Sequence, residues 1–320
     1  MTKLTKLLEY VNASSKDQKK MLSDPHFVRV VGEPTQKMLL QSEAGNMTTL
    51  VQEEVYRTVI EGAEPFKCMR DVEPIIPTDS YSVRFVKGEA GTYANQIAEG
   101  AKIDIDTQTY TKTDVTIDKY GTRPLITNEL IEDSLFGIVE LELKKAGARM
   151  ENKLNRVVLA SILAGITTNT LSPAGAHIAV SDLARATALI KKQNYLPDIL
   201  VTHPTAEGYL LQDSNLAYVS YAGGNGALRQ GDVGNKLMGL SPHTCTATDA
   251  ASPTWDDTTA GSDVTGLVLS KNDLGVICMR RDLTVEQYDD PIHDLVGIAL
   301  TMRYGTGVLR EAAGCKIYHK

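Results

Sequence analysis

Hydrophobic residues recur at steps of three and four along the middle of the chain, which is the spacing of one face of a helix. Asp133 and Ser134 are good N-terminal cap residues, and Gly165 is a typical stop signal. The pattern predicts a helix over about 134–164, a structural spine of roughly 45 Å at about 1.5 Å per residue. Its apolar stripe is Val139, Leu143, Ala146, Met150, Leu154 and Val157.

Shorter helices are predicted on both sides of this spine. Leucines and a valine at helical spacing mark residues 4–11, and a capping-box pattern starts a second helix over 49–62. Ser181 is expected to cap a helix that runs to Asn194, and Pro204 suits the first position of another short helix.

An alternating pattern predicts a two-stranded arm before the spine. Tyr81, Val83 and Phe85 alternate with polar residues, and residues 107–120 (TQTYTKTDVTIDKY) are rich in β-branched and aromatic side chains. Residues 88–106 between them are mostly small or polar. Because a hairpin with few apolar anchors is not stable alone in water, we expect the arm to lie on other structure, and on a neighbouring molecule if not on this chain.

Strands and helices are mixed without a regular βαβ period in the second half of the chain, which favours the α+β class. The predicted strands there are 199–202, 266–270, 275–279, 284–288, 296–304 and 316–318.

The composition is that of an ordinary globular protein of 320 residues, with 42% hydrophobic residues and a net charge of −7. No apolar run reaches the roughly 18 residues of a membrane span, so we expect no membrane association. The negative charge provides no overall attraction to nucleic acid. The four cysteines stand far apart without zinc-type spacing, and we interpret them as reduced core thiols.

No motif indicates an enzyme. The glycine cluster at 223–226 is not part of a Walker motif, and neither HExxH nor GxSxG is present. Four potential metal ligands gather at Asp289, Asp290, His293 and Asp294, but a solvated acidic turn is the interpretation that we favour. We therefore expect no catalytic, cofactor-binding or metal-binding residues.

Residues 93–134, YANQIAEGAKIDIDTQTYTKTDVTIDKYGTRPLITNELIEDS, resemble the major capsid proteins of tailed double-stranded-DNA viruses, which have the Hong Kong 97-like fold. Glu99 and Gly100 match a Glu-Gly pair in that family's extended loop, although the aromatic residue that often precedes the pair is absent. Residues 196–211 are similar to a strand and helix of the family's axial domain. The segment before the spine helix is matched by Glu129, Leu130, Glu132, Asp133 and Ser134.

The resemblance implies a fold with four parts. These are an N-terminal arm over 1–47, a peripheral domain over 48–79 and 118–170 that holds the spine helix, an extended β-hairpin loop over 80–117, and a mixed α/β axial domain over 171–320, with some C-terminal strands returning to the peripheral domain.

The same resemblance implies a structural subunit, not an enzyme, that assembles into pentamers and hexamers of an icosahedral shell around double-stranded DNA. It also implies residence in the virion capsid, assembly in the host cytoplasm, and portal and scaffold proteins as partners. Only about 47 residues precede the first capsid-like helix, which favours a separate scaffold or none. The assembly contacts implied are Glu99, Gly100, Lys102, Glu129, Glu132 and Asp133, and Lys16, Lys19 and Lys20 are a candidate inward-facing basic arm that contacts DNA phosphates without sequence specificity.

Two other classes remain open at this point. An encapsulin-type nanocompartment has the same fold and holds protein cargo in place of DNA. A soluble α+β enzyme would leave the exposed hairpin arm unexplained.

Overall fold

The computed structural model describes Met21, Asp24 and residues 55–88, 96, 97, 99, 102, 109–127, 138–213, 236–246, 254–256, 259–290 and 295–320. The chain divides into two compact units, which we describe separately. The first unit comprises Met1–Lys67, Lys119–Leu154 and Arg281–Arg303, and the second comprises Cys68–Asp118, Asn155–Arg280 and Tyr304–Lys320.

Two helices pack closely in the first unit. Residues 55–63 are helical, and they lie against the part of α7 (Ile138–Gly165) that belongs to this unit. A Cβ atom on Gly147 would collide with the carbonyl oxygen of Val59, and one on Gly62 would collide with the backbone of Lys144. Glycine is therefore needed at both positions for the two backbones to approach this closely.

The long helix predicted from the hydrophobic stripe is present. Leu143, Ala146, Met150 and Leu154 are buried as the stripe predicts. Further along α7, Val157 is only half-buried, whereas Val158 and Leu159 are fully buried, so the buried face is not the predicted stripe alone there. Residues 128–137, which include the predicted cap, lie outside the described part of the chain.

One sheet has the strand order β1-β10-β11-β4, with β5 also paired to β11. Its strands are β1 (Ile75–Pro77), β4 (Asp118–Thr122), β5 (Leu125–Thr127), β10 (Gly275–Asp290) and β11 (Leu295–Val308). The two strands predicted at 275–279 and 284–288 are in fact the single strand β10. The prediction was wrong because Arg280, Arg281 and Asp282 are polar and exposed, and an exposed stretch of strand resembles a turn in its hydrophobic pattern.

The second unit is built on a mixed sheet with the order β6-β12-β9-β7-β8. Its two central strands, β9 (Val264–Leu269) and β7 (Ile199–Thr202), are buried at every position, as expected for strands covered on both faces. The other strands are β6 (Thr170–Leu171), β8 (Ser241–Thr244) and β12 (Gly314–Tyr318). The sequence pattern did not predict β8, because proline is uncommon in strands and β8 contains Pro242. The proline is tolerated because β8 is an edge strand of the sheet.

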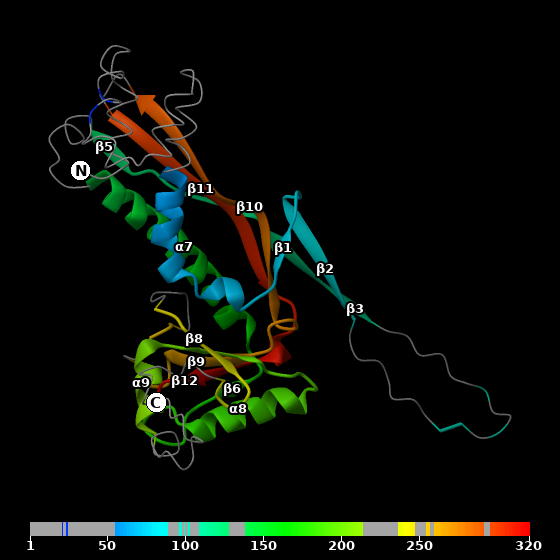
Figure 1. The fold of residues 1–320 in the computed structure, drawn as a ribbon. Helices are drawn as coiled ribbons and strands as arrows, with labels where there is room; N and C mark the ends of the chain where they lie inside the picture. The colour runs from blue at the N-terminus through cyan, green and yellow to red at the C-terminus, as the bar shows by residue number, and fades with distance from the viewer. Residues whose placement is uncertain are drawn as a thin grey trace. The chain divides into compact units, whose positions relative to one another are not determined.

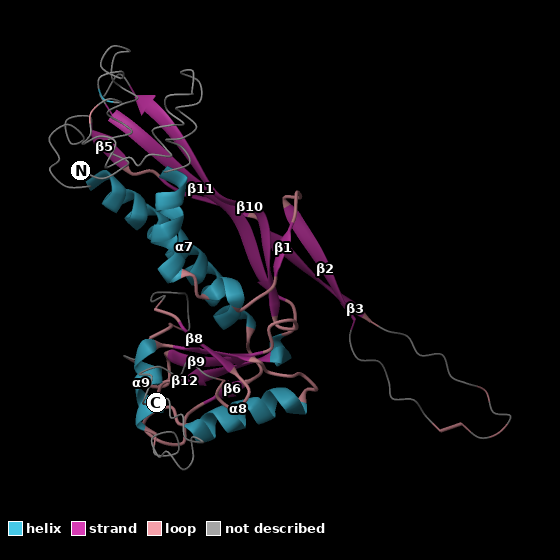
Figure 2. Ribbon diagram, in the orientation of Figure 1, coloured by secondary structure: helices cyan, strands magenta, loops and turns pink. Residues whose placement is uncertain are grey.

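Two helices, α8 (Val180–Lys192) and α9 (Pro204–Gln212), pack against this sheet (Figure 2). Pro204 occupies the first turn of α9 as predicted. The cap of α8 is Ala179 and not Ser181, so that prediction was wrong. Asn194 has a left-handed backbone (φ 64°) just after α8, a conformation that asparagine tolerates.

The fold is therefore α+β, as the sequence pattern predicts. None of the four cysteines is in a disulfide bond. Cys245, Cys278 and Cys315 are buried, and Cys68 is half-buried. Within the described ranges, no helix is long and apolar enough to cross a membrane.

Candidate assembly surface on the β2–β3 ribbon

A two-stranded ribbon forms where the sequence predicts the arm. β2 (Ser82–Gly88) and β3 (Tyr110–Thr116) pair antiparallel, from Ser82 opposite Thr116 to Gly88 opposite Tyr110 (Figure 1). The predicted strand 107–120 divides into β3 and β4 at Ile117, a fully buried residue whose N–H donates to the carbonyl of Tyr81 at 3.0 Å.

One face of the ribbon is anchored on the second unit. Val83 and Phe85 pack with Val115, which is 2% exposed, in a cluster that includes Val276 and Cys278 of β10. A Cβ atom on Gly307 would come within 2.6 Å of Cγ2 of Val115, so the ribbon also lies directly on β11. These few apolar contacts hold the base of the ribbon.

The opposite face, which we call the outer face, carries an ion pair between the strands. Arg84 Nε donates to Asp114 Oδ1 at 2.7 Å, and Arg84 Nη2 donates to Asp114 Oδ2 at 3.1 Å. The hydrogen bond from Arg84 is the main cause that lowers the pKa of Asp114, and the same bond raises the pKa of Arg84. Because the residues sit directly opposite each other, the two-pronged pair favours this strand register.

The outer face also exposes two large apolar side chains. Val86 and Tyr110 are each 64% exposed. Val86 lies opposite Lys112, and Tyr110 is two positions further along the same face, so the two are diagonal neighbours. An exposed apolar pair beside a charge pair has the composition of a protein contact surface.

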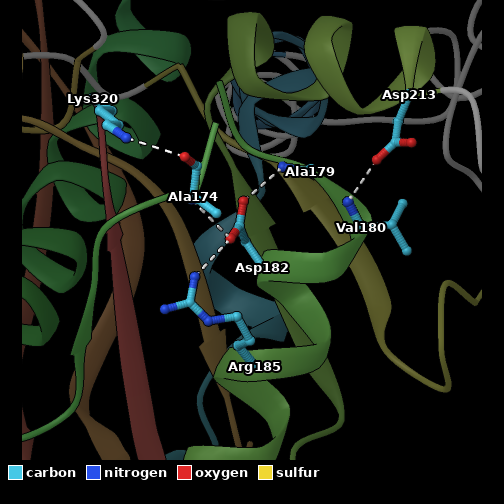
Figure 3. Close-up of polar contacts among 7 residues, drawn as sticks. All are labelled: Ala174, Ala179, Val180, Asp182, Arg185, Asp213 and Lys320. Carbon is cyan, nitrogen blue, oxygen red and sulfur yellow. Dashed lines mark hydrogen bonds and ion pairs between the residues drawn. The ribbon is translucent and has the colours of Figure 1, made fainter. Parts of the chain in front are cut away.

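A buried carboxylate organises the first turn of α8 (Figure 3). Asp182 is fully buried and accepts hydrogen bonds from the backbone N–H groups of Ala174 and Ala179, both at 3.2 Å. Arg185 Nη1 donates to Asp182 Oδ1 at 3.1 Å. The charge of this carboxylate is thus compensated by an arginine and by two N–H donors that would otherwise need water.

Two further contacts hold the same turn in Figure 3. The backbone N–H of Val180 donates to Asp213 Oδ2 at 2.9 Å, and Lys320 Nζ donates to the carbonyl of Ala174 at 3.1 Å. The cluster therefore joins α8, the end of α9 and the last residue of the chain. Its groups are used in holding these segments together, and we assign it a structural role.

The structure describes few of the residues that the resemblance singles out. Glu99 and Lys102 are described, and both are exposed. The remaining predicted assembly and basic residues lie outside the described part of the chain: Gly100, Glu129, Glu132, Asp133, Lys16, Lys19 and Lys20.

The side chains of the acidic segment 289–294 also lie outside the described part. Elsewhere, among the side chains that are described, no group of three or more histidine, cysteine, aspartate or glutamate residues is placed to hold a metal ion. The structure adds four outer-face residues that sequence reasoning did not select: Arg84, Asp114, Val86 and Tyr110. Their signal in the sequence is the alternation within 82–88 and 110–116, in which every second residue points away from the anchored face.

An α+β chain with a long helix, a two-stranded ribbon and a mixed sheet is characteristic of proteins that build viral shells with the Hong Kong 97-like fold. A sequence model described as "Phage capsid protein" matches residues 109–317, and the chain belongs to this family. No curated protein sequence matches the chain.

Solved structures show the same fold at low sequence identity. The capsid structure of cyanophage P-SCSP1u is 19% identical, with a TM-score of 0.63 over 78% of this chain and 87% of that one. The mature capsid of bacteriophage PhiM1 is 16% identical, with a TM-score of 0.59 over 78% and 86%. A virus-like particle from Pyrococcus furiosus is 12% identical, with a TM-score of 0.57 over 83% and 98%.

These comparisons confirm the expected resemblance to the major capsid proteins of tailed viruses and the expected fold. The protein is a capsid shell subunit, a structural component of the virion that associates with copies of itself.

Proposed function

We propose that this subunit assembles into pentamers and hexamers that close into an icosahedral shell around double-stranded DNA. The observation that supports this most directly is the outer face of the β2–β3 ribbon, which exposes Val86 and Tyr110 although its other face is anchored on the subunit. Such a ribbon gains stability when its outer face lies on a neighbouring subunit. Contacts between unlike surfaces that repeat around a ring satisfy the symmetry of a closed shell.

The domain map expected from the family resemblance is part of this proposal. The hairpin loop over 80–117 provides the reach to a neighbour, the spine helix stiffens the peripheral domain, and the axial domain over 171–320 lies at the centres of the pentamers and hexamers. The additional assembly contacts are Glu99, Gly100, Lys102, Glu129, Glu132 and Asp133. The role is structural, and we propose no chemical step for it.

The proposed partners follow from this role. Lys16, Lys19 and Lys20 face the genome and neutralise phosphates without reading sequence. A portal and a scaffold protein assist assembly, which takes place in the host cytoplasm. Reversing the charge of the three lysines is expected to lower the DNA content of purified particles, and unchanged DNA content would contradict this part of the proposal.

Assembly of the full chain tests the main proposal. We expect closed shells, or rings of five and six subunits, in electron micrographs of the purified protein, with matching masses from light scattering. The double variant Val86→Asp/Tyr110→Asp places two charges in the outer face and is expected to remain in small oligomers with an unchanged circular dichroism spectrum. The matched control Val86→Ile/Tyr110→Phe keeps the apolar surface and is expected to assemble. Normal shells from the charged variant would contradict the role of the outer face.

The alternative function is an encapsulin-type nanocompartment shell, which has the same fold and holds protein cargo. The content of particles isolated from the native source distinguishes the two. DNA inside supports the capsid function, whereas a defined protein cargo supports the nanocompartment.

A further inference from the structure

We propose that Cys68 and Cys245 form a disulfide bond under oxidising conditions, and that this bond ties the segment before β1 to the end of β8. The two Sγ atoms are 2.8 Å apart, although the residues are 177 positions apart in the sequence. This separation is less than 1 Å longer than a disulfide bond of ~2.05 Å. Both residues belong to the second unit, so the inference does not depend on shell assembly.

Cys245 is held in place by its backbone. Its N–H donates to the carbonyl of Thr202 at 3.0 Å, and its carbonyl accepts a hydrogen bond from Trp255 Nε1 at 2.9 Å. Cys245 is 1% exposed, and Trp255 is fully buried. The backbone of Cys245 is therefore fixed by the edge of the sheet and by the indole, and its side chain is buried.

The position of Cys68 is fixed by the short helix that follows it. Cys68 immediately precedes η2 (Met69–Asp71), whose first residue is fully buried and donates its N–H to Asn155 Oδ1 at 3.2 Å. A second interaction links η2 to β8: the charge of Asp71 raises the pKa of His243, partly offsetting the larger lowering by burial. The hydrogen bond to Asn155 thus fixes η2 on α7, the charge of Asp71 acts on His243 of β8, and the two thiols lie at this junction.

The difference in exposure gives the two thiols different roles in the reaction. Cys68 is half-buried, so its thiolate is the one that attacks a small-molecule disulfide such as oxidised glutathione. This attack forms a mixed disulfide and releases one glutathione thiolate. The thiolate of Cys245 then attacks the Cys68 sulfur and releases the second glutathione thiolate. The two protein thiols lose two protons and two electrons, and glutathione disulfide is reduced to two glutathione molecules.

The other two cysteines provide internal controls. Burial raises the pKa of Cys278, and it raises the pKa of Cys315 to about 12. Because the thiolate is the reacting form, both are expected to stay reduced under the same treatment.

The test is thiol counting on the purified full chain. The folded protein is incubated with oxidised glutathione, then denatured and alkylated with iodoacetamide, and its peptides are analysed by mass spectrometry. We expect alkylation at Cys278 and Cys315 only, a cross-linked peptide pair containing Cys68 and Cys245, and monomeric mobility on a non-reducing gel. Alkylation at all four cysteines, or a cross-link through any other pair or between chains, would overturn the proposal.

A stability measurement checks the consequence of the bond. Closing so long a loop restricts the unfolded chain, and we expect the thermal unfolding midpoint to rise by roughly 5–10 °C on oxidation and to return on reduction. Cys68→Ser and Cys245→Ser are expected to show no shift, whereas Cys278→Ser retains it. An equal midpoint for oxidised and reduced protein, with the cross-link verified, would overturn the stabilising role assigned to the bond.

Discussion

Glu73 is a carboxyl group buried in the second unit, where it is 1% exposed. Burial raises its pKa from 4.5 to about 8, with a small opposing effect from the Thr306 hydroxyl, which donates to Oε2 at 3.5 Å. In the described part of the chain no donor pairs with its Oε1. Well below pH 4.5 the group is neutral in both the folded and the unfolded chain, so folding carries no ionisation cost there.

The first prediction follows from that burial. As pH rises from 4.5 to 8, Glu73 ionises in the unfolded chain but stays protonated in the folded chain. The free energy of unfolding therefore falls, by at most about 5 kcal/mol. The decrease levels off above the folded pKa. Urea denaturation at pH 5 and pH 8.5 measures it. Glu73→Gln is expected to lose less stability across this interval than the wild type, whereas Glu64→Gln at an exposed position serves as the control. Parallel pH profiles for wild type and Glu73→Gln would be inconsistent with this account.

At the scale of elements, helix 55–63 and α7 of the first unit approach closely where they cross. Alanine normally favours a helix over glycine by about 1 kcal/mol. At Gly147 the added methyl group meets the carbonyl oxygen of Val59, so the helices must separate. We expect Gly147→Ala to lower the free energy of unfolding by about 1–3 kcal/mol.

Gly208 in α9 is the matched control for this prediction. A Cβ atom there meets nothing within 4 Å, so Gly208→Ala is expected to be neutral or to stabilise by up to about 1 kcal/mol. Denaturant titrations of the two variants measure the contrast. Equal stabilisation by both substitutions would show that the helix crossing tolerates a methyl group.

The elements that sequence reasoning found are those whose pattern is long or continuous. For α7, β7 and β9 the hydrophobic residues of the segment itself indicate which positions are buried. The short strands β1 and β6 do not, because a segment of two or three residues becomes a strand only through a partner distant in the chain. The proximity of the two thiols could not be predicted for the same reason, since no local pattern relates Cys68 to Cys245. The outer face of the ribbon was predicted as a polar arm, but its register and its exposed Val86 and Tyr110 needed the structure.

At the scale of the whole molecule, the ribbon must keep its register if its outer face is to match the same surface on every neighbour. The Arg84–Asp114 pair is exposed and adds little to the stability of the folded chain, so its effect is expected in assembly. Arg84→Glu removes both hydrogen bonds and places two negative charges opposite each other, which disfavours the register. We expect a large loss of assembled particles in light scattering and electron microscopy, with an unchanged unfolding midpoint.

The charge-swapped variant Arg84→Glu/Asp114→Arg separates register from surface charge. It restores an opposite-charge pair between the same two positions while it reverses the order of the charges on the outer face. If the pair acts by holding the strands in register, the double variant assembles and the single variant does not. High salt should weaken assembly of the double variant and of the wild type alike, because the exposed pair is screened in both. A double variant that fails as completely as the single one would show that Arg84 itself contacts the neighbouring subunit, and the pair would then belong to the interface and not to the ribbon.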